Sequence, residues 1–85
     1  MTPAEFASAC LAYCAATGGS VTSWGRTRKH NDAVDGVKDR AHLLWTACDV
    51  VYDDALPVDL RDKLAARLGL MLIHEGDHDH VQAVR

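Results

Sequence analysis

The sequence predicts an α+β fold in which helices pack on one face of a small, mainly antiparallel sheet. Two observations support it: helix-like periodic segments alternate with short β-prone runs, and the last two such runs are joined by a tight turn. The 85 residues, of which 48% are hydrophobic and 25% charged, suffice for one domain over residues 1–85. This composition is typical of a folded globular domain rather than a disordered chain.

The first expected element is a helix that begins after Thr2. Thr2 can cap it, Pro3 suits its first position, and Glu5 completes a capping box. Gly18-Gly19 is expected to end this helix, because glycine adopts the left-handed conformation at little cost. The apolar face of the helix carries Phe6, Cys10, Tyr13 and Cys14.

Two short strands are expected after this helix. Residues 21–24 alternate and are β-prone, while residues 47–52 are apolar and β-branched, so each run is typical of a strand. Residues 25–40 are polar and show no sustained period, which favours a short helix at residues 29–34 followed by a loop.

A second amphipathic helix and a β-hairpin are expected in the remainder of the chain. After Pro57 leucines recur every four residues, as on one helix face, at Leu60, Leu64 and Leu68. Gly69 ends this helix. Residues 70–74 resemble a buried strand, residues 75–77 a turn, and residues 78–84 a closing strand.

Charge and cysteine content exclude several classes of protein. The net charge of −3, with histidines neutral, argues against non-specific binding of nucleic acid, which needs clustered Lys and Arg. No apolar run reaches the roughly 20 residues of a membrane span, and no secretory signal is visible. Cys10 and Cys14 have the spacing of two thiols on one helix face and lack a CxxC pair, so all three cysteines are expected to be reduced. We therefore expect synthesis in the cytoplasm without a signal peptide.

Histidines and one aspartate give the clearest indication of chemistry. His42 precedes the strand expected at residues 47–52, and Asp49 lies within it. A buried carboxylate is costly without a partner, and a metal ion would supply one. His78 and His80 are two apart on the expected final strand, so their side chains should share a face. A set of two histidines and one carboxylate matches the ligands of a catalytic zinc site, in which three protein ligands leave one position open for water.

Four segments form an ordered pattern across most of the chain. They are Ser23-Trp24-Gly25-Arg26, Asn31-Asp32-Ala33-Val34-Asp35-Gly36-Val37, His42-Leu43-Leu44-Trp45-Thr46-Ala47-Cys48-Asp49 and Asp77-His78-Asp79-His80-Val81. The pattern resembles the zinc D-alanyl-D-alanine peptidase family, whose signature runs Ser-x-x-Arg, Asn-x-x-Val-x-Gly-Val, Ser-x-His-x-x-Gly-x-Ala-x-Asp and a closing His-x-His. That family includes cell-wall carboxypeptidases and phage endolysins that cut L-alanyl-D-glutamate bonds. The resemblance implies a zinc DD-peptidase/hedgehog-like fold.

The resemblance implies a role for each matching residue. His42, Asp49 and His80 would be the ligands of a Zn²⁺ cofactor. Arg26 would bind the substrate carbonyl, and His78 would face the reaction centre. A metal centre of this kind hydrolyses an amide bond in the stem peptides of peptidoglycan.

The resemblance also implies a general base on the turn before the last ligand. Asp77, three positions before His80, matches that residue, and Glu75 is a second candidate because a turn can bring it close. Zinc lowers the pKa of bound water toward about 7, and the base accepts the proton and passes it to the leaving amine.

Two positions depart from the family pattern. Trp45 stands where the family has glycine, and Arg40 stands where it has the serine two positions before His42. Neither change removes a ligand, but both bear on turnover and on the substrate pocket. The expected function is therefore a zinc peptidase of the cell wall, of the carboxypeptidase or endopeptidase type, released to the wall or carried on a virion.

Two other hypotheses stay open. The chain could be a structural or wall-binding module, such as a virion component, that keeps the fold and the metal without turnover. Alternatively, it could be a metal-free α+β interaction protein in which the match is fortuitous.

Overall fold

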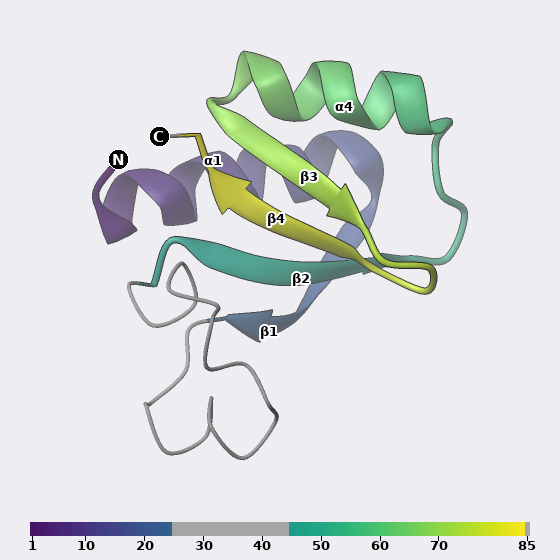
Figure 1. The fold of residues 1–85 in the computed structure, drawn as a ribbon, viewed down its shortest axis with the longest axis horizontal. Helices are drawn as coiled ribbons and strands as arrows, with labels where there is room; N and C mark the ends of the chain where they lie inside the picture. The colour runs from purple at the N-terminus through teal and green to yellow at the C-terminus, as the bar shows by residue number, and fades with distance from the viewer. Residues whose placement is uncertain (25–44, 85) are drawn as a thin grey trace.

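Two helices and four strands occur in residues 1–24 and 45–84, the part of the chain that this computed structural model describes. In chain order they are α1 (Pro3–Thr17), β1 (Gly19–Trp24), β2 (Ala47–Tyr52), α4 (Val58–Arg67), β3 (Leu70–His74) and β4 (Asp79–Ala83) (Figure 1). The strands form one antiparallel sheet in the order β1-β2-β4-β3. The predicted α+β class is confirmed, whereas the short helix expected at residues 29–34 lies outside the described residues.

The start and end of α1 follow the local signals in the sequence. The Thr2 side chain accepts a hydrogen bond from the Glu5 backbone N–H at 3.1 Å, and the Thr2 N–H donates to Glu5 Oε1 at 2.8 Å. Gly18 has a φ of 73° and donates its N–H to the Cys14 carbonyl at 2.8 Å. The predicted capping box and the glycine stop are therefore both confirmed.

A close approach between α1 and the sheet explains the second glycine. A Cβ atom on Gly19 would lie 2.5 Å from Cγ1 of Val50, which is far inside van der Waals contact. Glycine at this position lets the chain pass directly from the helix into β1, next to β2.

Both helices cover the same face of the sheet, as the sequence predicts (Figure 1). The core between helices and sheet consists of Phe6, Cys10, Tyr13, Cys48, Val50, Ala65, Leu70 and Val81. Phe6 also makes an edge-to-face contact with Trp24, with ring centroids 5.6 Å apart. On α4, Leu64 and Leu68 pack against this core, while Leu60 is 43% exposed. No helix in the described residues is long and apolar enough to cross a bilayer.

The strand bounds agree with the predictions except at β1 and β4. The bounds of β2 and β3 are confirmed, and β1 begins at Gly19, two residues earlier than expected. The expectation that His78 shares the final strand with His80 is wrong, because β4 begins at Asp79. The hairpin turn is closed by a hydrogen bond from the Glu75 N–H to the His78 carbonyl at 3.0 Å, so His78 belongs to the turn.

Candidate metal centre

The sheet face opposite the helices brings Asp49 and His80 together. Asp49 on β2 and His80 on β4 are direct cross-strand partners. Their neighbours Cys48 and Val81 lie in the core, so alternation along the strands places Asp49 and His80 on the other face. The side chains are 16% and 8% exposed, and Asp49 Oδ1 lies 3.7 Å from His80 Nδ1. Two of the three predicted zinc ligands therefore meet.

Gln82 orients the imidazole of His80. His80 Nε2 lies 2.8 Å from Gln82 Oε1, and the Gln82 amide donates from Nε2 to the Met71 sulfur at 3.4 Å. Since the amide oxygen only accepts, Nε2 of His80 carries the proton and donates it. The Nδ1 atom is then the nitrogen that faces Asp49. Metal-bound histidines are usually held in this way, through a hydrogen bond from the nitrogen that does not bind the ion.

The separation of the two side chains suits a shared ion. At 3.7 Å, Oδ1 and Nδ1 are too far apart for a hydrogen bond. Two ligands that each lie about 2.0–2.2 Å from a tetrahedral zinc are about 3.3–3.6 Å apart, which is close to the observed distance. Carboxylate oxygen and imidazole nitrogen are also ordinary zinc ligands. Asp49 and His80 are thus spaced as two of the ligands of one zinc ion would be.

The rest of the predicted ligand set lies outside the described residues. His42 and Arg26 fall in residues 25–44, so the third ligand and the substrate-binding arginine stay predictions. Within residues 1–24 and 45–84 no three His, Cys, Asp or Glu side chains form a group that could hold a metal ion. The third ligand that the sequence predicts, His42, is not among these residues.

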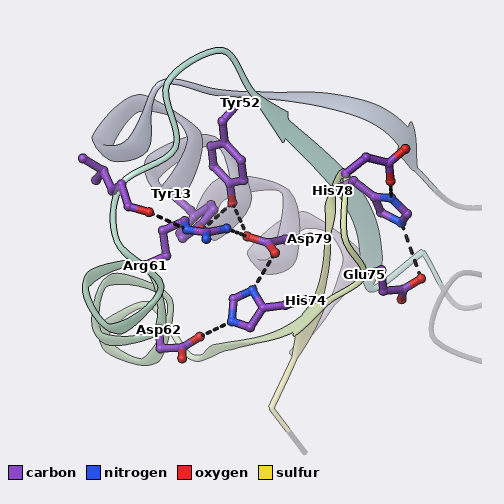
Figure 2. A network of polar contacts seen from close by, with 10 residues as sticks. Tyr13, Tyr52, Arg61, Asp62, His74, Glu75, His78 and Asp79 are labelled. Atoms are coloured by element: carbon purple, nitrogen blue, oxygen red, sulfur yellow. Dashed lines mark hydrogen bonds and ion pairs between the residues drawn. The ribbon is translucent and has the colours of Figure 1, made fainter.

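The predicted general bases lie on the hairpin turn beside β4. His78 contacts both of them: Nδ1 lies 2.7 Å from Asp77 Oδ1, and Nε2 lies 3.5 Å from Glu75 Oε2 (Figure 2). The hydrogen bond with Asp77 raises the pKa of His78, and the charges of Asp49 and Glu75 raise it further. The same contact lowers the pKa of Asp77, whose side chain is 92% exposed. The charge of Asp49 on β2 therefore favours the protonated form of His78 on the turn.

The most buried carboxylate of the described residues is Asp79, which the sequence reasoning did not single out. Its side chain is 3% exposed and faces the helices between β2, β3 and α4. Asp79 Oδ2 accepts from the Tyr52 hydroxyl at 2.9 Å and from Arg61 Nη1 at 2.5 Å, and Oδ1 lies 2.6 Å from His74 Nδ1 (Figure 2). The Tyr52 hydroxyl also contacts the Tyr13 hydroxyl at 2.6 Å.

The electrostatics of this network follow from its geometry. Burial alone would raise the pKa of Asp79, but the hydrogen bonds from His74, Tyr52 and Arg61 outweigh it and hold the pKa below its usual range. The hydrogen bond to Asp79 raises the pKa of His74, against its desolvation, and a second contact to Asp62 at 3.0 Å adds to the effect. Every close polar neighbour of Asp79 thus stabilises its charged form.

The Asp79 network has a structural role that sequence alternation could have indicated. Side chains two positions apart on a strand share a face. Asp79 is two positions from Val81, and His74 is two positions from Leu72, so both polar residues lie on the face that the core covers. Arg61 also donates from Nε to the Leu56 carbonyl at 2.9 Å. Through Arg61, the network therefore connects α4 and the loop before it to β4 of the sheet.

Trp45 occupies an unusual backbone conformation just before β2. Its φ is 60°, the left-handed region that favours glycine, and its side chain is 51% exposed. It is the one non-glycine residue with a positive φ in the described segments. This is the position at which the zinc D-alanyl-D-alanine peptidase pattern has glycine, the residue for which this conformation costs least.

The fold and the site together define a small α+β domain with a His–Asp pair on the sheet face opposite its helices. Searches among protein families, curated proteins and solved structures find no match to this chain.

The first prediction concerns the Asp79 network. Replacing Asp79 with Asn leaves the largely buried guanidinium of Arg61, and the half-exposed ring of His74, against a neutral group, and we expect the free energy of unfolding to fall by roughly 3 kcal/mol. The matched control is Asp62→Asn, because Asp62 is 50% exposed and contacts only His74 within this network. We expect it to cost less than about 1 kcal/mol. Urea denaturation followed by circular dichroism measures both, and equal losses would contradict the central role of Asp79.

The network also predicts a pH dependence. The pKa of His74 is raised in the folded protein. Its contribution to the stability of the fold is therefore complete below its pKa in the unfolded chain, about 6.5, and is lost as the pH rises through its pKa in the folded protein. The lowered pKa of Asp79 acts at the other end: its contribution is lost as the pH falls through that value. The loss of stability above pH of about 6.5 should be smaller in Asp79→Asn than in the wild type.

The second prediction concerns Trp45. Replacing Trp45 with Gly relieves the left-handed strain of an L-residue, partly offset by the larger entropy of glycine in the unfolded chain. We expect a net gain of about 0.5–1 kcal/mol in the free energy of unfolding. Trp45→Ala is the control, since it removes the exposed indole but keeps a Cβ. If alanine stabilises the protein as much as glycine does, the gain comes from losing the indole and the strain argument is wrong.

Proposed function

We propose that this protein is a zinc peptidase that hydrolyses an amide bond in the stem peptides of peptidoglycan. The observation that carries the proposal is the pairing of Asp49 with His80 across β2 and β4, with Nδ1 and Oδ1 3.7 Å apart. The two atoms belong to side chains that both bind zinc in proteins, and a cation between them would contact both at ordinary ligand distances.

The backbone at Trp45 supports the same proposal independently. The resemblance to the peptidase family rests on sequence letters, whereas the φ of 60° is a property of the chain's shape. A left-handed residue four positions before Asp49 agrees with the glycine of the family pattern, even though the residue itself has changed.

Each residue has a distinct part in the proposed reaction. Asp49 and His80 hold the ion together with His42, and Gln82 fixes the ring of His80. The bound zinc supplies a water of lowered pKa and a Lewis acid for the carbonyl oxygen.

Proton transfer and substrate binding fall to the other residues of the site. Asp77, or Glu75 on the same turn, accepts the proton of the attacking water and passes it to the leaving amine. Arg26 binds the substrate carbonyl, and His78, whose pKa is raised, donates a hydrogen bond to the oxygen on which charge develops.

One observation favours a second function, that of a wall-binding module without turnover. Trp45 presents a side chain that is 51% exposed at the position where the peptidase pattern has no side chain. A large ring there can occupy the space of a substrate or stack on a wall component. This reading keeps the metal and the fold but removes hydrolysis.

The third prediction tests the metal centre without an activity readout. We expect native mass spectrometry to show one zinc ion per chain and the affinity to fall at least roughly 100-fold in Asp49→Asn and His80→Gln. Asp59→Asn, on the exposed side of α4, is the control and should bind like the wild type. Gln82→Leu removes the acceptor for His80 and should weaken binding by roughly 10- to 100-fold, whereas Gln82→Glu keeps an acceptor and should weaken it less.

Folding must be checked alongside zinc binding, because His80 is buried. Circular dichroism of each variant shows whether a lost ion reflects a lost ligand or a lost fold. A folded wild-type protein that binds no zinc would reject both the peptidase and the metal-containing module.

The fourth prediction separates these two functions. Incubation with defined muropeptides, with and without zinc, should give cleaved stem peptide or free D-alanine that mass spectrometry detects, and Asp49→Asn should abolish it. Replacing both Asp77 and Glu75 by their amides should reduce the rate by about 10²–10⁴-fold while zinc stays bound. Intact muropeptides with a zinc-loaded, folded protein would support the binding module instead.

A further inference from the structure

Two cysteines from distant parts of the chain meet in the core. Cys10 on α1 and Cys48 on β2 are both 0% exposed, and their sulfur atoms are 2.9 Å apart. Both are free thiols in the structure, as the sequence predicts. The separation is roughly 0.9 Å longer than the S–S bond of about 2.05 Å in a disulfide. Small side-chain rotations therefore suffice to bring the two sulfur atoms into bonding distance.

We propose that Cys10 and Cys48 form a dithiol pair that a low-molecular-weight disulfide oxidises to an intramolecular disulfide between α1 and β2. The pair lies on the helix-facing side of the sheet, opposite Asp49 and His80. Cys48 is next to Asp49 in the chain, but its side chain points to the other face, so the proposal requires no metal ion and holds whether or not the protein is a peptidase.

The reaction is two successive thiol–disulfide exchanges. When α1 opens transiently from the sheet, the Cys10 thiolate attacks one sulfur of the external disulfide, whose S–S bond breaks and releases one small thiolate. Cys48 then loses its proton and attacks the Cys10 sulfur, which releases the second small thiolate. Two protein thiols are oxidised, one external disulfide is reduced to two thiols, and the protons of Cys10 and Cys48 end on those thiols.

Cys14 is the competing partner, and the structure disfavours it. It lies on the same helix as Cys10, one turn later, whereas Cys48 faces Cys10 from the sheet. Burial raises the pKa of Cys14 to about 11, and the hydrogen bond with Cys10 together with burial raises the pKa of Cys48, so acidity does not select between these two partners. The position of the Cys48 sulfur 2.9 Å from that of Cys10 does. The same hydrogen bond lowers the pKa of Cys10, which is therefore the thiol of the three that loses its proton most readily.

The bond would close a large loop. Cys10 and Cys48 are 38 positions apart, so the cross-link ties the first helix to the second strand and spans everything between them. Such a link restricts the unfolded chain more than a short-range one does. Oxidation is therefore expected to stabilise the native fold and to fix α1 on β2.

The fifth prediction tests this pair on the intact protein. After incubation with oxidised glutathione under native conditions, the wild-type mass should fall by two hydrogens, and peptide mapping without reduction should join Cys10 to Cys48. Only Cys14 should remain open to alkylation. The melting temperature should be higher by roughly 10 °C or more in the oxidised protein, and a reductant should reverse the shift.

Matched variants distinguish the pair from its neighbour. Cys14→Ala should form the same cross-link, and Cys48→Ala should not form it. Because either substitution could perturb the core, circular dichroism of each variant accompanies the mapping, and the wild-type map carries the test if a variant fails to fold. A native protein that forms no Cys10–Cys48 bond, or that mainly joins Cys14 to another cysteine, would overturn the proposal.

Discussion

The register of β2 against β4 determines what each face of this sheet can do. Val50 pairs with Asp79, and Asp49 pairs with His80. Because side chains alternate along a strand, a slip of one residue would move a whole set of side chains to the other face. If β2 were the strand that turned over, Asp49 would enter the core among the helices; if it were β4, the network would lose its buried carboxylate, Asp79. The Asp49–His80 pair and the core therefore depend on the same backbone alignment.

Asp79 helps to hold this register, because a buried carboxylate tolerates few positions. Its charge is costly away from water, and only the observed alignment gives it Tyr52, Arg61 and His74 at once. These partners come from β2, α4 and β3, so any displacement of β4 breaks contacts to three elements. The lowered pKa of Asp79 shows that the hydrogen bonds outweigh the desolvation. The network thus contributes more to specifying the alignment than a purely apolar contact of the same size would.

The elements with local signals could be predicted from the sequence, and those that depend on distant partners could not. The capping box at Thr2 and the glycine stop at Gly18 act within a few residues, so the bounds of α1 were predictable. The partners of Asp79 lie 27, 18 and 5 residues away, and nothing in the local pattern reveals them. The start of β4 was missed for a related reason: the turn hydrogen bond that excludes His78 depends on hairpin geometry. The meeting of Asp49 and His80 was predicted only on the condition that their strands are neighbours, which the structure shows.

Metal binding and turnover make different demands on this fold. The Asp49–His80 pair is held by two paired strands, which fix a ligand geometry well, and both side chains are largely buried. The candidate bases Asp77 and Glu75 lie instead on the hairpin turn, and their side chains are 92% and 45% exposed. A solvated carboxylate is a weak base, and the contact with His78 lowers the pKa of Asp77 further. Efficient proton transfer would therefore require the substrate itself to cover the turn and remove water from these carboxylates. A bound peptide that shielded Asp77 from water would raise its pKa and make it a stronger base for the proposed reaction.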